Sequence, residues 1–506
     1  MNLTLSLAIN GSGGGSGTAK KRKVRDSVIV VDDGVGDGGV DSSRVVTRLV
    51  QARERMVARL DEDVDDPWVV AAPDDGGAAG RGLRLMHLLL SSVAAGESGD
   101  ARAAAAALHE VYRRASFRGA DPARRVAAYF ADALATRLVR RPPASAAPPT
   151  RTERFLAYTM FYQASPLYQF AHFTANQAIV EAFEGGGRRR LHVVDFDVSH
   201  GFQWPSLIQS LSDAAAASTS RSSHDGDGDE QVSLRITGFG ASADELRQTE
   251  ARLARFASGC PNLRFEFEGI VDGRPNSGGR HEECIRIDDG ATVVVNLVFP
   301  AARNSRASTR ESCRALARIR SLNPALVFLV EKDGGSGGNA GTSRGRSPGL
   351  LPQFTASLRY FAALFDSLHE CLPADSAERL AIERNHLGTE ISAAMACLLD
   401  SNRGGAGHVP EPCSSSSSSA TWSWKEMMES AGFEAAKLSS RTVSQAKLLL
   451  KMKSGGGCGG GFRVVEGDGG RAMSLGWRDS TLMITATGWR RRRRSSKQDI
   501  IRLASC

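Results

Sequence analysis

The sequence predicts an α/β protein: a doubly wound, mostly parallel sheet with a helical unit before it and antiparallel strands after it. Three observations support this prediction. Helical patterns fill residues 82–185, and strand and helix patterns alternate over 191–330. Short strand patterns then follow one another closely near the end of the chain. The 506 residues are enough for a large core and for more than one domain.

Residues 1–81 have the composition of a disordered region. They contain a Gly/Ser run, a Gly/Asp tract and an acidic run, and only a weak helix is expected, between Ser43 and Leu60. The region also holds a compact basic cluster, made of Lys20, Lys21, Arg22 and Lys23. Nuclear import receptors recognise such clusters through their charge. We interpret it as a nuclear localisation signal; the alternative is a solvated basic tail.

The helical unit is recognised by its apolar spacing and by residues typical of helix starts. Its predicted helices begin at about Gly82, Ala101, Pro122 and Pro166. Asp121 is a good N-cap for the third helix, because its carboxylate can accept from the free amides of the first turn. Gly185 ends the fourth helix. We therefore expect an all-helical unit over residues 82–185.

The alternating region gives the order of the sheet elements. Strands are predicted at 191–196, 233–238, 263–268, 292–298 and 325–331. Helices are predicted at 204–215, 244–257, 306–320, 354–370 and 376–399. Strands joined through helices are parallel, with right-handed crossovers. The closing strands are predicted at 446–452, 462–466, 474–477 and 482–487, and their short connections indicate antiparallel pairing.

The most informative segment is the first strand and the turn after it. The strand consists of Leu191, His192, Val193, Val194 and Asp195. Ligands of parallel sheets usually bind at the carboxyl ends of the strands, so the turn is the first place to look for chemistry. Its candidate groups are Asp195, Asp197 and His200. A nucleotide-binding turn, however, needs several glycines, and this turn has one, Gly201. We therefore expect Asp195 and Trp204 to fix the turn and its packing.

The alternative function is a methyltransferase-like enzyme or a small-molecule-binding protein. A cofactor site of this type needs an acid at the end of the second strand to hold a ribose, and that strand ends with Gly238, Phe239 and Gly240. A hydrolase that uses His200 needs a nucleophile, and Ser199 lacks an elbow motif around it. We therefore expect no enzymatic activity and no catalytic residue, cofactor site or metal site.

Positive charge is concentrated in two short clusters, although the net charge of the chain is +8. One is the basic cluster near the N-terminus. The other comprises Arg490, Arg491, Arg492, Arg493 and Arg494, at the start of a predicted basic tail over residues 490–506. Between the clusters the chain is close to neutral, so no broad DNA-binding groove is predicted. The five arginines are candidates for contact with DNA phosphates; the alternatives are a solvated tail or a second import signal.

A short leucine motif provides a candidate protein-binding element. Leu85, Leu88 and Leu89 fit the L-x-x-L-L pattern, in which the leucines share one helix face and can enter an apolar groove. The alternative is that they lie in the core of the helical unit, and we favour this alternative because such faces are normally buried. No apolar run reaches the roughly 20 residues that span a bilayer, so no membrane association is expected.

Several of these motifs, in this order, resemble those of the plant GRAS transcriptional regulators. The strand Leu191 to Asp195 resembles the VHIID motif, and the helix start from Gly201 to Gln209 follows it as in the family. The resemblance covers residues 82–489. It divides them into a helical cap with the first leucine-rich region (82–185), the VHIID and second leucine-rich regions (191–330), a PFYRE-like region (350–400) and a SAW-like region (420–489).

The resemblance implies a Rossmann-like core similar to that of methyltransferases, with an N-terminal helical cap. It implies a nuclear regulator of transcription that forms homo- or heterodimers with other GRAS proteins and contacts other transcription factors. Direct DNA binding occurs in some members of the family. A DELLA-type hormone-sensing segment is not recognisable, so we expect a scarecrow-like, non-DELLA member.

Overall fold

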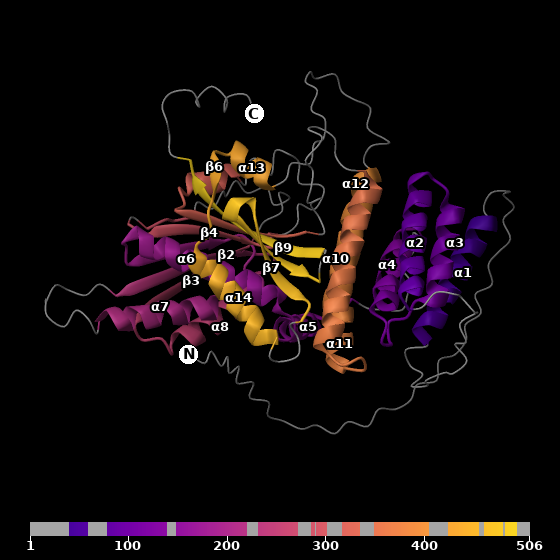
Figure 1. Cartoon of the computed structure of the whole chain (residues 1–506), viewed down its shortest axis with the longest axis horizontal. Helices are drawn as coiled ribbons and strands as arrows, with labels where there is room; N and C mark the ends of the chain where they lie inside the picture. Colours follow the sequence, from indigo (N-terminus) through magenta and orange to yellow (C-terminus); the bar gives the residue numbers. More distant parts are fainter. Residues whose placement is uncertain are drawn as a thin grey trace, which may run out of the picture.

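The computed structural model describes residues 40–58, 78–138, 148–219, 231–271, 285–288, 290–300, 316–333, 349–403, 424–454, 460–478 and 481–492. Within these ranges the chain forms a large twisted sheet with helices on both faces and a helical bundle at one end (Figure 1). In the described part of the chain, no helix is long and apolar enough to cross a membrane.

The bundle contains the first four helices, which stand side by side at the right of Figure 1. They are α1 (Val40–Ala58), α2 (Ala78–Glu97), α3 (Ala101–Arg114) and α4 (Pro122–Leu138). Asp100 caps α3, because its carboxylate accepts a 2.9 Å hydrogen bond from the amide of Ala103. The predicted starts at Ala101 and Pro122 are thus confirmed.

Helix α1 confirms the helix expected between Ser43 and Leu60, and it packs into the bundle, which was not expected. Leu49, Ala52 and Met56 recur at helical spacing and are buried against the bundle. Arg53 forms a two-pronged ion pair with Asp132 of α4, with an Nη2 to Oδ2 distance of 2.9 Å. The helical cap therefore begins at α1 and not at Gly82.

Two helices lead from the cap to the sheet: α5 (Arg151–Ala164) and α6 (Pro166–Gly186). Thr150 and Glu153 form a capping box at the start of α5, which satisfies two of its free amides. Ser165 ends α5 and caps α6, whose first residue is Pro166 as predicted. The short connection between the two helices turns α6 onto the sheet, where it packs against β4, β5 and β9.

The parallel half of the sheet has the strand order β3-β2-β1-β4-β5, the order of a Rossmann-type sheet. Its strands are β1 (Arg190–Asp195), β2 (Val232–Gly240), β3 (Leu263–Val271), β4 (Thr292–Val298) and β5 (Leu326–Lys332). They match all five predicted strands to within a few residues. Successive residues face different cores: Val193 packs into one hydrophobic cluster and Val194 into the other. The predicted doubly wound sheet is confirmed.

The antiparallel half continues the same sheet from β5 in the order β9-β8-β7. Its strands are β6 (Phe433–Ala436), β7 (Phe462–Gly467), β8 (Ala472–Trp477) and β9 (Thr481–Arg491). The last strand, β9, lies beside β5 and also pairs with β6 and β8. A single 3-10 turn, η2 (Asp468–Gly470), connects β7 and β8.

The helices of the alternating region cover the sheet and join it to the cap. They are α7 (Trp204–Thr219), α8 (Ala243–Ala257), α10 (Leu350–Cys371), α11 (Ala377–Ile382), a π-helical segment η1 (Glu383–Leu387), α12 (Gly388–Arg403), α13 (Trp424–Ser430) and α14 (Ser440–Ser454). A further helical turn spans 316–321. Helices α10 and α12 stand between the bundle and the sheet (Figure 1).

Two predictions for the closing region are wrong. Residues 446–452 were expected to form a strand and lie in α14, where Ala446, Leu449 and Leu450 form the buried face. A tail was expected to begin at residue 490, yet β9 runs through Arg491 and pairs there with β6. In both cases tertiary packing decides the backbone state, and local composition does not reveal it.

Candidate functional site at the first strand-helix turn

The VHIID-like residues form the central strand of the parallel half. Leu191, Val193 and Val194 are buried in the two cores, as expected for a strand covered on both faces. The imidazole Nε2 of His192 lies 2.9 Å from the hydroxyl of Thr237 on β2. Burial lowers the pKa of His192 to about 4. This histidine is therefore a neutral structural group near pH 7.

Asp195 ends β1 and belongs to a buried polar network. The amide of Asn296 on β4 donates to the Asp195 carboxylate at 3.2 Å and to the side-chain oxygen of Gln203 at 3.1 Å. Gln203 in turn donates to Asn176 of α6 at 3.0 Å. Asn176 donates back to the main-chain oxygen of Gln203 at 2.8 Å. The network joins two strands, the turn and α6.

Burial makes Asp195 an unusual carboxyl group. Burial is the largest effect and raises its pKa to about 7, although the hydrogen bond from Asn296 favours the charged form. A raised carboxyl pKa in a turn of this kind can indicate a general acid or base. Here, however, Asn296 and the amide of Asp197 both donate to Oδ1 of Asp195. The carboxyl group holds the turn together, as predicted.

Side chains pack closely together at the carboxyl ends of β1 and β2, where a Rossmann-type sheet binds its nucleotide. Phe196 stacks on Phe239 with ring centroids 5.1 Å apart. A Cβ atom built on Gly238 would lie 3.0 Å from Val198. Gly201 has a φ of +70°, and a Cβ there would lie 2.7 Å from Thr249 of α8. Gly201 therefore allows the turn to pack closely against α8, and this packing, not the approach of a phosphate, accounts for the glycine.

His200 lies under aromatic rings of α5, on the outer side of the turn. Its ring makes edge contacts with Phe155 and Tyr158, at centroid distances of 5.2 and 4.9 Å. Its carbonyl oxygen accepts from Arg252 of α8 at 3.1 Å. Burial, followed by the charge of Arg252, lowers the pKa of His200 to about 4. His200 therefore joins the turn to the cap.

A second polar group connects the carboxyl end of β5 to α6 and α12. Lys332 donates to Glu390 of α12 at 2.8 Å, and Tyr168 of α6 donates to the same carboxylate at 3.3 Å. The Tyr168 hydroxyl also lies 2.8 Å from the Nε2 atom of His386. The charge of Lys332 holds Glu390 ionised against the cost of burial, and the pKa of Glu390 is lowered. These residues come from distant segments, and no local sequence pattern indicates their contact.

The leucine motif lies in α2 and is mainly buried. Leu85 and Leu89 are almost fully covered, and Leu88 is half-buried against the bundle core. The favoured interpretation, that these leucines belong to the cap core, agrees with this placement. The exposed apolar side chain of α2 is Leu83, which the motif does not include.

The structure divides the arginine cluster. Arg490 and Arg491 lie in β9, and Arg492 follows directly; its amide donates to the carbonyl of Gly432 at 3.1 Å. Arg491 also donates to Asn323 at 2.6 Å. Arg493 and Arg494 lie outside the described residues, as do Lys20, Lys21, Arg22 and Lys23.

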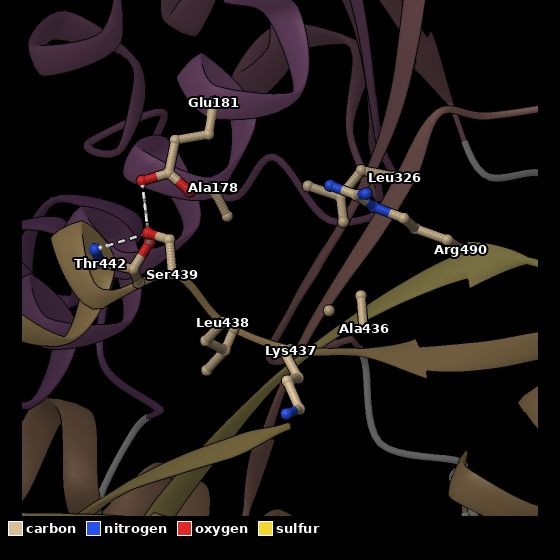
Figure 2. Close-up of a pocket in the computed structure, with 10 residues that line it drawn as sticks. Ala178, Glu181, Leu326, Ala436, Lys437, Leu438, Ser439, Thr442 and Arg490 are labelled. Carbon is tan, nitrogen blue, oxygen red and sulfur yellow. Dashed lines mark hydrogen bonds between the residues drawn. The ribbon is translucent and has the colours of Figure 1, made fainter. Parts of the chain in front are cut away.

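A small pocket of ≈ 30 Å³ lies beside Arg490, between α6, the start of α14 and the sheet (Figure 2). On one wall Glu181 accepts from the hydroxyl of Ser439 at 2.7 Å. Lys437 and Arg490 both line the pocket. Sequence reasoning missed Lys437, because it stands alone between β6 and α14. The pocket has room for one or two waters and not for a nucleotide.

Among the described residues, no group of three or more His, Cys, Asp or Glu side chains is placed to hold a metal ion. The described polar groups at the turn hold segments of this chain together. Comparison with known proteins identifies the family of this chain. The family model of the GRAS domain family matches residues 85–490. The chain belongs to the GRAS domain family.

Relatives within the GRAS family include both scarecrow-like and DELLA proteins. Scarecrow-like protein 23 of Arabidopsis thaliana is 33% identical, over 82% of this chain and 91% of the relative. DELLA protein GAI1 of Vitis vinifera is 32% identical, over 80% of this chain and 61% of the relative. Scarecrow-like protein 28 of Arabidopsis thaliana is 33% identical, over 81% of this chain and 58% of the relative. The chain therefore spans about three fifths of two of these relatives.

The fold of this GRAS chain is similar to that in the crystal structure of SCL7 from Oryza sativa. The TM-score is 0.58 at 29% sequence identity, and the match covers 80% of this chain and 99% of the other. This similarity supports the predicted Rossmann-like fold. Because scarecrow-like and DELLA relatives are about equally similar, the comparisons establish the family, and the non-DELLA assignment stays a prediction.

Proposed function

We propose that this GRAS protein is a nuclear regulator of plant transcription that acts through protein partners and has no catalytic activity. The observation that carries the proposal is the packing of the first strand-helix turn. Phe196, Val198 and Gly201 are packed against neighbouring strands and helices of the same chain. A sheet whose ligand-binding end is filled in this way has its outer surfaces left for macromolecules. Other GRAS proteins, in homo- or heterodimers, and other transcription factors are the proposed partners.

The alternative, a methyltransferase-like enzyme or small-molecule-binding protein, is less well supported. The raised pKa of Asp195 is the feature that favours it. Yet Asp195 is 3% exposed and its neighbours Asn296 and Gln203 are buried with it. A reacting molecule needs direct access to the group that transfers its proton.

The regulatory function is tested by tethering. The full chain is fused to a DNA-binding domain of known specificity and expressed in plant protoplasts with a matching reporter gene. We expect reporter expression to change, in either direction, relative to the DNA-binding domain alone. The control is a fusion carrying Trp204→Asp, which places a charge in the core and should abolish the effect. An unchanged reporter with well-expressed fusion protein would contradict the proposal.

Direct DNA contact is a further part of the proposal. Arg490, Arg492 and Lys437 are cations near the end of β9, and the arginine run continues beyond the described residues. Phosphate contacts of this kind give an affinity that falls with salt. A gel shift should compare the full chain with a chain ending at Arg492, which keeps the pairing of β9 with β6. We expect the shorter chain to bind more weakly and with a shallower salt dependence. Equal binding by both chains would show that the residues beyond Arg492 make no phosphate contact.

Nuclear localisation is tested with a fluorescent fusion. Replacing Lys20, Lys21, Arg22 and Lys23 with alanine should move the fusion out of the nucleus. Because the run Arg490 to Arg494 can serve as a second import signal, a variant lacking both clusters completes the experiment. Full nuclear accumulation of that double variant would rule out both clusters as the import signal.

A further inference from the structure

A buried group of charges lies where the cap meets the segment after α10. Arg125 of α4 and Glu383 of η1 are fully buried, and the Nε atom of Arg125 donates to the carboxylate at 3.0 Å. Arg379 of α11 is 3% exposed, with its Nε atom 3.7 Å from the same carboxylate. Two buried guanidinium groups thus face a single buried carboxylate, so the three buried groups together carry a surplus of positive charge.

The guanidinium groups also have unused donors. The Nη2 atom of Arg125 and the Nε and Nη1 atoms of Arg379 are buried and have no hydrogen-bond partner. Each unsatisfied buried donor is costly, more so when it is charged. Burial raises the pKa of Glu383 to about 7, although both arginines oppose the rise.

The neighbouring groups offset this buried charge only in part: the exposed carboxylate of Asp375 acts on Arg379 through its charge. The carbonyl of Gly119 accepts from Arg125 at 2.7 Å and from Arg379 at 3.4 Å, but it is neutral. Burial lowers the pKa of His369, and the two arginines add to that shift, so its ring is within their electrostatic range. Its Nδ1 atom is buried and also lacks a hydrogen-bond partner. The segment that carries Glu383 is a π-helix, a form often found at functional sites.

We propose that Arg125 and Arg379 bind a small oxyanion of the phosphate or sulfate class at this junction. The unused donors of the two guanidinium groups match such an ion, because planar forks of N–H groups suit its several oxygen atoms. The ion supplies the missing negative charge and joins α4 of the cap to α11. Because both side chains are at most 3% exposed, the candidate ligand is a free ion enclosed at the junction and not a phosphate attached to a macromolecule.

The test is calorimetric titration of the purified full chain with inorganic phosphate at constant ionic strength, with chloride as the reference salt and sulfate in a parallel titration. We expect saturable binding to the natural sequence. Arg379→Gln should weaken it roughly 10–100-fold, because it removes charged hydrogen bonds. The matched control is Arg384→Gln, five residues further on at an exposed position, which should bind as the natural chain does.

A second variant keeps the test decisive if Arg379→Gln does not fold. Glu383→Gln removes the competing carboxylate and should bind phosphate about tenfold more tightly, as expected from a lost repulsion. Its melting temperature should be lower than that of the natural chain without phosphate and should recover when phosphate is added. The proposal is overturned if the natural chain shows no saturable phosphate binding, or if Glu383→Gln gains neither affinity nor recovery. The buried donors would then be satisfied by water alone.

Discussion

Replacing Asp195 with asparagine should change how stability depends on pH. The buried carboxyl group has a pKa of about 7, against an ordinary value of 3.8. Between these two pH values the folded state binds a proton that the unfolded state has released. The free energy of unfolding therefore falls as the pH rises through this window and levels off above pH 7. Asparagine carries no proton to release, so the variant lacks this contribution.

The magnitude follows from the two pKa values. A pKa difference of about 3 units corresponds to roughly 4 kcal/mol in total, and the part between pH 5 and pH 8 is about 2–3 kcal/mol. On going from pH 5 to pH 8, the free energy of unfolding of Asp195→Asn should therefore rise by about 2–3 kcal/mol relative to that of the natural chain. At any single pH, the difference in free energy of unfolding between Asp195→Asn and the natural chain is less informative. It also contains the cost of burying the new amide N–H groups, which need hydrogen-bond partners.

The assay is urea unfolding followed by tryptophan fluorescence at both pH values, with the slope of the transition compared between variants. The control is Asp213→Asn, on the exposed face of α7. Its free energy of unfolding should differ from that of the natural chain by the same amount at both pH values. If the difference for Asp195→Asn is also independent of pH, Asp195 titrates normally. The buried network described for the turn would then be incorrect.

Two further predictions concern close packing and the cap. Gly201→Ala should destabilise the chain by about 1–3 kcal/mol in urea unfolding, because of the positive φ and the contact with α8, whereas Gly96→Ala, with open space around it, should not. Equal effects at both positions would contradict the packing of the turn. Arg53→Ala should release α1 from Asp132 and speed chymotrypsin cleavage within α1, while Arg55→Ala at an exposed position should not. Unchanged cleavage in Arg53→Ala would show that apolar contacts alone hold α1.

The sequence predicts the parallel half well because its strands and helices have distinct patterns. The strand at 292–298 is rich in valine and other β-branched residues, and β4 has the same bounds. Residues 446–452 are wrongly predicted as a strand because their pattern is not distinct. Their run of apolar residues has no clear period by itself. Only the burial of Ala446, Leu449 and Leu450, with Leu448 outward, shows the helix.

The long-range contacts of the site could not be predicted. Asn176, Gln203 and Asn296 are ordinary polar residues in the sequence, and only the order β1-β4 and the turn of α6 bring them together. Arg125 and Glu383 are 258 positions apart. In α1, by contrast, the spacing of Leu49, Ala52 and Met56 was visible. The helix expected between Ser43 and Leu60 is present, but its acidic and glycine-rich surroundings do not reveal that it packs into the bundle.

The central claim is that side chains of this chain close the ligand-binding end of the Rossmann-type sheet. Calorimetric titration of the purified chain with S-adenosylmethionine tests it most directly. We expect heats no larger than those of dilution at every concentration. Saturable binding that is lost in Gly201→Ala, together with methyl transfer to an acceptor, would contradict it.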